Sequence, residues 1–160
     1  MKRLLQVLLL VLSTAGLIAC GPPRKSVFPP TVSIQQLSVL AGGQWRLTVR
    51  IQNNSYAEMD FRSLEGQLQV ASLMPILLDA RFKRDIPALV GDVIHLDVLP
   101  TPAMTKALQA VAARGSSGSL AYRLSGSTMA RPEQEKQPRN FSFSGNDWLS
   151  PVPGIPGTYR

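Results

Sequence analysis

The sequence is poor in the residues from which catalytic and metal sites are usually built. Its 160 residues include one cysteine and one histidine, which is too few for an internal disulfide or for the usual four-ligand Cys/His zinc site. Carboxylates are also few, with 10 Asp and Glu in all. They show no paired spacing, and no glycine-rich phosphate loop is present. We therefore expect no enzyme, no metal and no cofactor, and the single cysteine becomes the most informative residue.

That cysteine, Cys20, follows a segment with the pattern of a secretory signal peptide. Lys2 and Arg3 are positively charged, and residues 4–18 are almost entirely apolar, which is the order of regions that such peptides show. The apolar stretch is shorter than the roughly 20 residues that a spanning helix needs. Gly21 and the two prolines after it prevent a helix from continuing.

The four residues Leu17, Ile18, Ala19 and Cys20 are similar to the lipobox of bacterial lipoprotein precursors. This resemblance implies that a diacylglyceryl group is attached to the Cys20 sulfur, that the chain is cut before Cys20, and that the new amino group is acylated. Two or three acyl chains anchor a protein stably, since each buried CH2 contributes about 0.8 kcal/mol. We expect residues 1–19 to be a lipoprotein signal peptide and Cys20 to hold the protein on a lipid bilayer. The alternative is an ordinary signal peptide or anchor that happens to end in a cysteine.

Charge and the residue after the cysteine refine the expected location. An aspartate directly after the cysteine commonly retains Gram-negative lipoproteins in the inner membrane. Here that residue is Gly21, so for a Gram-negative host we expect the outer membrane, facing the periplasm. Without Lys2 and Arg3 the chain has 15 basic against 10 acidic residues, a net charge of about +5, which suits anionic lipid nearby. Nucleic acid is not an expected partner, because the chain is exported and has no basic stripe interleaved with aromatics.

Proline density divides the rest of the chain. Residues 20–30 contain four prolines and predict an extended tether of about 30 Å, at about 3.1 Å per residue, which would lift the domain off the lipid. Residues 31–150 predict the globular domain. Residues 151–160, PVPGIPGTYR, contain three prolines and two glycines, and we expect a loose or surface-draped tail that forms neither a ladder nor a helix.

Apolar and polar residues alternate through much of residues 31–150. In residues 45–52, Trp45 and every second residue after it are apolar, which predicts a half-buried strand. Residues 31–39 change parity near Gln35 and Gln36, which predicts a β-bulge, and residues 41–43 predict a turn. Further strands are expected at 62–73, 77–89, 91–100, 119–126 and 140–145. Short strands separated by turn residues are typical of a β-sandwich or barrel.

One segment has helical periodicity. Thr101 is placed as an N-cap and Pro102 at the first helical position, and Gly115 ends the segment, as helix start and stop signals predict. Its apolar stripe consists of Met104, Ala107, Leu108, Val111 and Ala112. The stripe is narrow, so we expect a short amphipathic helix that packs on the side or end of the sandwich.

The order of these elements resembles the type 2 late embryogenesis abundant family, whose domain is also called the water stress and hypersensitive response (WHy) domain. The residues that carry the resemblance are LTVRIQN at 47–53 and MDFRSLEGQLQV at 59–70, followed by 86–98, the helix at 101–114 and 120–124. It implies a mainly β, immunoglobulin- or fibronectin type III-like antiparallel sandwich, a role in desiccation or other stress or in envelope maintenance, and no catalytic residues. In the family a proline often follows the asparagine, whereas here Asn54 follows Asn53. We expect asparagine chemistry to hold this turn, because asparagine tolerates left-handed angles and bonds its own backbone.

Two patterns have a functional and a structural interpretation. His95 and Asp97 share the polar face of a strand, where a hydrolase uses such a pair to activate a serine, but we favour a solvent-exposed strand histidine. The basic run at 81–84 suits either phosphate headgroups or the protection of an edge strand, and we favour the second. The predicted function is a non-enzymatic, membrane-anchored envelope lipoprotein with a binding or stress-protective sandwich. The alternative is an accessory subunit of an envelope assembly or lipid transport complex.

Overall fold

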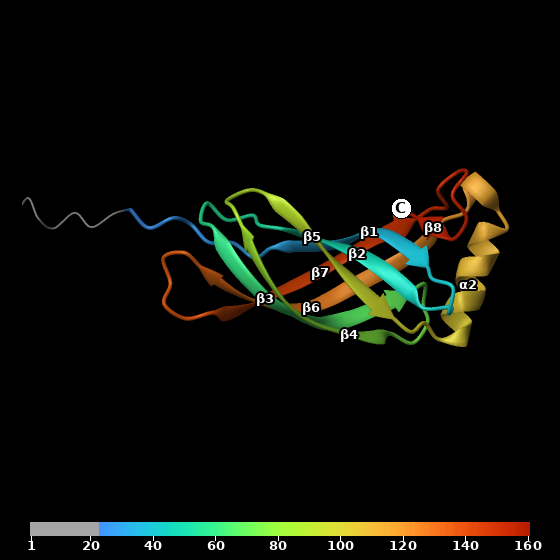
Figure 1. The fold of residues 1–160 in the computed structure, drawn as a ribbon, viewed down its shortest axis with the longest axis horizontal. Helices are drawn as coiled ribbons and strands as arrows, with labels where there is room; N and C mark the ends of the chain where they lie inside the picture. The colour runs from blue at the N-terminus through green and yellow to red at the C-terminus, as the bar shows by residue number, and fades with distance from the viewer. Residues whose placement is uncertain (1–22) are drawn as a thin grey trace, which may run out of the picture.

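The computed structural model describes residues 23–160. In this range the chain forms eight strands, one α-helix and one 3-10 turn: β1 Thr31–Val39, β2 Trp45–Gln52, β3 Met59–Val70, β4 Ile76–Ile86, β5 Gly91–Val98, α2 Pro102–Ala112, η2 Gly115–Ser117, β6 Leu120–Pro132, β7 Arg139–Leu149 and β8 Thr158–Tyr159. Sheet A has the strand order β5-β2-β1-β8 and sheet B the order β4-β3-β6-β7 (Figure 1). Every strand pairing is antiparallel. The predicted antiparallel β-sandwich with one short amphipathic helix is confirmed for this part of the chain.

The predicted signal peptide at residues 1–19 lies outside the described residues. The same is true of the lipobox residues Leu17, Ile18, Ala19 and Cys20, and of the first part of the predicted tether. The lipid anchor therefore stays a prediction.

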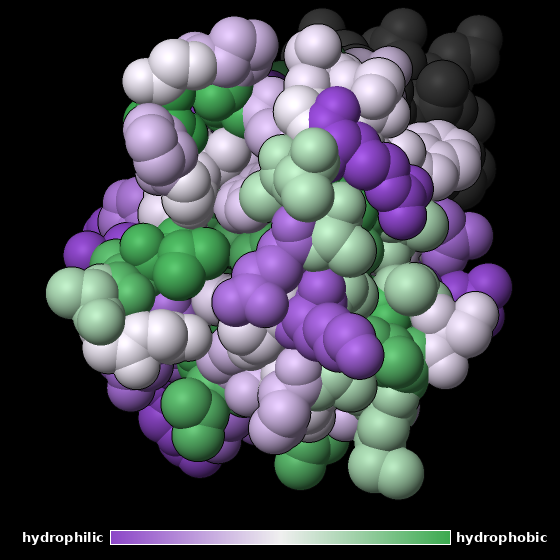
Figure 2. Space-filling view, turned by 90° about the vertical axis from the view of Figure 1, so that its right-hand side faces the viewer, coloured by the Kyte–Doolittle hydropathy of each residue, from purple (hydrophilic) through white to green (hydrophobic). Residues whose placement is uncertain are grey.

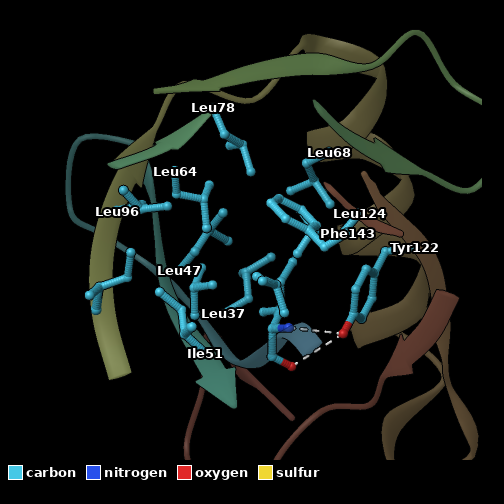
Figure 3. Packing of buried hydrophobic residues seen from close by; sticks show 14 of the residues in the cluster. Leu37, Leu47, Ile51, Leu64, Leu68, Leu78, Leu96, Tyr122, Leu124 and Phe143 are labelled. Atoms are coloured by element: carbon cyan, nitrogen blue, oxygen red, sulfur yellow. Dashed lines mark hydrogen bonds between the residues drawn. The ribbon is translucent and has the colours of Figure 1, made fainter. Parts of the chain in front are cut away.

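The core lies between the two sheets and follows the alternation in the sequence. In β2, Trp45, Leu47, Val49 and Ile51 are all fully buried, while Arg46 between them is exposed. Leucines from both sheets meet in the interior, as Figure 3 shows for Leu37, Leu47, Leu68 and Leu124. Each such side chain contributes roughly 1.5–3 kcal/mol by leaving water. In a chain with one cysteine, this packing is the main source of stability.

The predicted bulge in β1 is confirmed, since the register against β2 shifts between Ile34 and Gln36. Beside it, the Ile34 N–H donates to the Tyr122 hydroxyl at 3.0 Å, and that hydroxyl donates to the Ile34 carbonyl at 3.4 Å (Figure 3). Tyr122 comes from sheet B and is buried. Burial raises the pKa of its phenol. The hydroxyl therefore links the two sheets through the backbone at the bulge.

Helix α2 covers one end of the sandwich (Figure 1). The Thr101 side chain caps it by accepting a hydrogen bond from the Met104 N–H, and Met104, Leu108 and Val111 are buried, as predicted. Ala112 is exposed, so its place in the apolar stripe was wrong. Among the described residues, no helix is long and apolar enough to cross a bilayer.

The prediction of an unpaired C-terminal tail is wrong. Thr158 and Tyr159 pair with β1 as the short strand β8, Tyr159 is buried, and Ser150 and Arg160 exchange two backbone hydrogen bonds. Pro151 lies opposite Tyr159 in an antiparallel bridge, and β8 itself contains no proline, so the N–H groups of β8 remain available. Gly154 and Gly157, both at positive φ, turn the chain back toward β1. The sandwich therefore extends to the last residue.

Candidate functional site

The two ends of the sandwich are formed by different elements. We call the loop end the one formed by residues 23–30, the β2–β3 turn at 53–58, the β4–β5 turn at 87–90 and the β6–β7 loop at 133–138. The helix end carries α2 and the C-terminal tail. Figure 1 shows the described chain entering at the loop end, opposite α2.

The outer face of sheet A carries His95 and Asp97 on β5. Both are exposed, as predicted, and His95 Nδ1 lies 3.3 Å from Thr48 Oγ1. Both Asp97 oxygens accept hydrogen bonds from Arg46, each at 2.7 Å. This bidentate bond lowers the pKa of Asp97 and raises the pKa of Arg46. The structure thus brings His95 and Asp97 to one face, but the carboxylate is oriented toward a guanidinium and not toward the imidazole.

The basic run at 81–84 lies on β4, which is an edge strand of sheet B. Arg81, Lys83 and Arg84 are exposed, while Phe82 packs against the core. Charged side chains on an edge strand discourage pairing with a second chain. The edge position predicted for this cluster is confirmed.

A buried carboxylate, Asp60, lies at the start of β3 and was not identified from the sequence. Its Oδ2 accepts hydrogen bonds from Arg62 Nε and Nη2 at 3.1 and 2.8 Å and lies 3.5 Å from Arg131 Nη2. Burial raises the pKa of Asp60, but the bond from Arg62 and the charges of Arg62, Lys83 and Arg131 outweigh burial and leave the pKa below its usual value. Oδ1 is buried without a partner in the described part of the chain. The cations come from three strands that are far apart in sequence, so no local sequence motif predicts this cluster.

The turn after β2 is organised by the side chain of Asn53, which is 0% exposed. Its Nδ2 donates to the carbonyls of Ala57 at 2.9 Å and of Ile86 and Pro87 at 3.0 Å. Its Oδ1 accepts a hydrogen bond from the Ser55 N–H at 2.9 Å. One amide therefore ties the β2–β3 turn to the end of β4.

The prediction that asparagine chemistry holds this turn is confirmed, but the mechanism is only partly the one expected. The local backbone bond is present. The left-handed angle is not, because the described non-glycine residues with positive φ are Ala71 and Leu89.

Residues 23–30 do not form the free tether that the sequence predicted. They have no regular secondary structure, yet hydrogen bonds hold them against the β2–β3 turn and the β6–β7 loop. These bonds join Lys25 N to Gln134 Oε1, Tyr56 N to Ser26 O, Phe28 N and O to Ser55 Oγ, and Asn54 Nδ2 to Pro29 O. Lys25 also forms an ion pair with Glu133. The segment donates through the N–H groups of Lys25 and Phe28 and accepts through the carbonyls of Ser26, Phe28 and Pro29.

The helix end contains a hollow of about 560 Å³ between α2 and the C-terminal tail. The residues that line it, among them Val152, Ile155 and Tyr159, include no acidic or basic side chain. Figure 2 looks onto this end and shows separate apolar groups between polar side chains. Among residues 23–160, no group of three or more His, Cys, Asp or Glu side chains is arranged to hold a metal ion.

Comparison with known proteins does not assign a family. No protein-family model matches the sequence, and no curated protein matches it. One similar solved structure is a crystal structure of a protein from Archaeoglobus fulgidus, 5% identical, which covers 79% of this chain and 98% of that chain with a TM-score of 0.44. Another is the solution structure of AT1g01470 from Arabidopsis thaliana, 10% identical, which covers 87% of this chain and 88% of that chain with a TM-score of 0.45. The resemblance to the type 2 late embryogenesis abundant family therefore stays a prediction.

Proposed function

We propose that this protein is a non-enzymatic lipoprotein of a bacterial cell envelope, anchored through acylated Cys20, with a β-sandwich that acts as a binding or stress-protective module. The observation that carries the proposal is the short distance in sequence between the lipobox and the folded domain. Cys20 lies five residues before Lys25, whose backbone is already bonded to the β6–β7 loop. Anchoring at Cys20 would therefore hold the sandwich close to the bilayer.

The surroundings of His95 support a role without catalysis. Its neighbour Asp97 is fully engaged by Arg46, so it does not orient the imidazole in the way a hydrolytic triad requires. A His95→Ala variant should leave any phenotype of the protein unchanged. If the His95→Ala variant is present at normal levels but does not support the function of the wild-type protein, an enzymatic role would be favoured instead.

The alternative, an accessory subunit of an envelope assembly or lipid transport complex, is favoured by one surface. Leu77 on β4 and Leu99 after β5 are 78% and 73% exposed and border the same hollow of about 300 Å³. Exposed apolar side chains that cluster at a hollow often mark a protein interface. A partner that docks there would make the sandwich a subunit and not an autonomous module.

A deletion strain complemented with variants tests both functions. The protective module predicts higher envelope permeability or poorer survival of drying or osmotic shock in the deletion strain, restored by wild type and not by Cys20→Ser. Unchanged permeability and survival would count against it. Crosslinking of the lipidated protein separates the alternatives, because a stoichiometric partner lost in Leu77→Ser indicates a subunit, and the absence of a partner favours the autonomous module.

A further inference from the structure

The loop end carries a cluster of exposed apolar side chains that the fold does not require. Phe28, Tyr56, Leu89 and Val90, which we call the tip, are 45 to 59% exposed. The Phe28 and Tyr56 rings meet edge to face with centroids 6.3 Å apart. The Leu89 N–H donates to the carbonyl of Ser55, the residue before Tyr56. Three separate segments thus bring these side chains to one place.

The backbone of the tip is strained at Leu89. Leu89 has a φ of +61°, a conformation that costs an ordinary L-residue roughly 1–2 kcal/mol and that glycine or asparagine adopts more easily. Its side chain is 57% exposed, so core packing does not compensate the strain. Strain of this kind is concentrated at functional positions.

Basic residues lie at the same end of sheet B. The strand register aligns Met59, Ile86 and Pro132 at this end, and the cluster of Arg62, Lys83 and Arg131 around Asp60 begins one residue further into sheet B. Acidic residues are present at this end as well. Glu133 and Glu135 are each paired with a cation, Asp60 is paired with Arg62 and Arg131, and Glu58 and Asp85 are exposed. Aromatic and aliphatic side chains in front and cations behind are the arrangement that amphipathic surfaces use at a bilayer, where the cations contact lipid phosphates.

The position of the anchor points the tip toward the lipid. The Ser26 carbonyl accepts a hydrogen bond from the Tyr56 N–H, and Ser26 follows Cys20 by six residues. Six fully extended residues span at most about 22 Å, so acylated Cys20 cannot be far from the tip. The helix end lies the length of β6 away, roughly 40 Å for 13 residues at about 3.3 Å each.

We propose that the loop end is a membrane-contacting surface, in which Phe28, Tyr56 and Leu89 enter the interfacial layer of the anchoring bilayer while Arg62, Lys83 and Arg131 face its anionic headgroups. The inference rests on the proposed anchoring through Cys20 and adds a fixed orientation to it. In this orientation the loop end contacts the membrane, and α2 and the hollow beside the C-terminal tail face away from it.

Depth-dependent fluorescence quenching of the full, acylated chain tests this orientation. The chain has two tryptophans, Trp45 in the core and Trp148, which is 63% exposed near the helix end. A Tyr56→Trp, Trp148→Phe variant moves the exposed indole to the tip, and wild type is its matched control. In phosphatidylethanolamine and phosphatidylglycerol vesicles that contain a nitroxide-labelled lipid, we expect the tip variant to lose several-fold more emission than wild type.

A second variant separates insertion from stability. Leu89→Asn removes the apolar side chain and relieves the strain, so it should reduce quenching of the indole at position 56 without lowering the melting temperature. Mass spectrometry of the same sample reports acylation of Cys20. An acylated protein whose tip indole is quenched no more than Trp148 overturns the orientation and leaves the anchor intact. A protein without acyl chains overturns both.

Discussion

Replacement of Asn53 by alanine should destabilise the protein far more than the same change at the neighbouring Asn54. Asn53 is fully buried and its amide bonds three carbonyls and one N–H. The Asn54 amide bonds Pro29 and Thr31 at the surface, where water can replace it. The sequence shows two adjacent asparagines, and only the structure distinguishes them.

The size of the effect follows from the bonds that are lost. The side chain makes four hydrogen bonds. At a net contribution of about 0.5–1 kcal/mol for each bond, Asn53→Ala should lose roughly 2–4 kcal/mol. For Asn54→Ala we expect about 0.5 kcal/mol, because its partners become solvated. At about 2–4 °C per kcal/mol for a chain of this size, the melting temperature should fall by roughly 5–15 °C in the first variant and by about 1–2 °C in the second.

Urea unfolding of the full chain, followed by circular dichroism, measures both free energies under the same conditions. The midpoint should fall strongly for Asn53→Ala with little change in the slope, because the surface exposed on unfolding stays the same. If the two alanine variants differ by less than about 1 kcal/mol, the buried amide does not hold the turn in the way described.

Three further predictions test the core and the charged cluster. Tyr122→Phe removes the hydroxyl that bonds Ile34 and should cost about 1–2 kcal/mol at neutral pH. Because burial raises the pKa of Tyr122, wild type should lose stability as the pH rises above about 10, and urea midpoints at neutral and alkaline pH should show a smaller loss in Tyr122→Phe. The pKa of Asp60 is lowered, so the stability that its charge contributes is lost as the pH falls below about 4. The free energy of unfolding of Asp60→Asn should therefore fall less at acid pH than that of wild type, and an equal fall in both would contradict the role of the cluster. A Cβ at Gly126 would lie 2.1 Å from a backbone oxygen of β3, so Gly126→Ala should cost about 2–3 kcal/mol. Gly42→Ala, with nothing within 4 Å, should leave the melting temperature nearly unchanged, and equal losses in the two variants would refute the close approach of β3 and β6.

The sandwich could be predicted from the sequence because its signals are local. Apolar and polar residues alternate from Trp45 to Gln52, which predicts a strand. Thr101 and Pro102 predict the start of a helix, and the change of apolar parity at Gln35 predicts the bulge. Each of these features depends on burial of one face or on hydrogen bonds to nearby backbone, and the structure confirms the strand, the capped helix and the bulge.

The errors concern contacts between residues far apart in sequence. The prolines of residues 20–30 and 151–160 predict chain without ladders, but proline density does not reveal that Pro29 O meets Asn54 or that Tyr159 pairs with Leu37. The same limit hides the contact of Asn53 with Ile86. For the candidate sites, the sequence located the edge cluster at 81–84, while the lipid attachment at Cys20 stays a prediction. The tip and the Asp60 cluster form only when separate segments are brought together.

These corrections change the expected position of the domain relative to the membrane. A free tether of ten residues would place the sandwich about 30 Å from the lipid. With Lys25 already bonded to the domain, the five residues from Cys20 to Lys25 allow at most about 18 Å. If the proposed anchoring at Cys20 holds, the sandwich presents a defined surface to the bilayer, and the helix end is the surface that we expect to be available to ligands or partners.

The most direct test of the account is the intact mass and the N-terminal peptide mass of the full chain purified from bacterial membranes. The account predicts a mature protein that begins at Cys20 and carries two or three acyl chains on that residue. A protein that begins at Met1, or one with an unmodified Cys20 thiol that washes off the membrane in buffer without detergent, would contradict it.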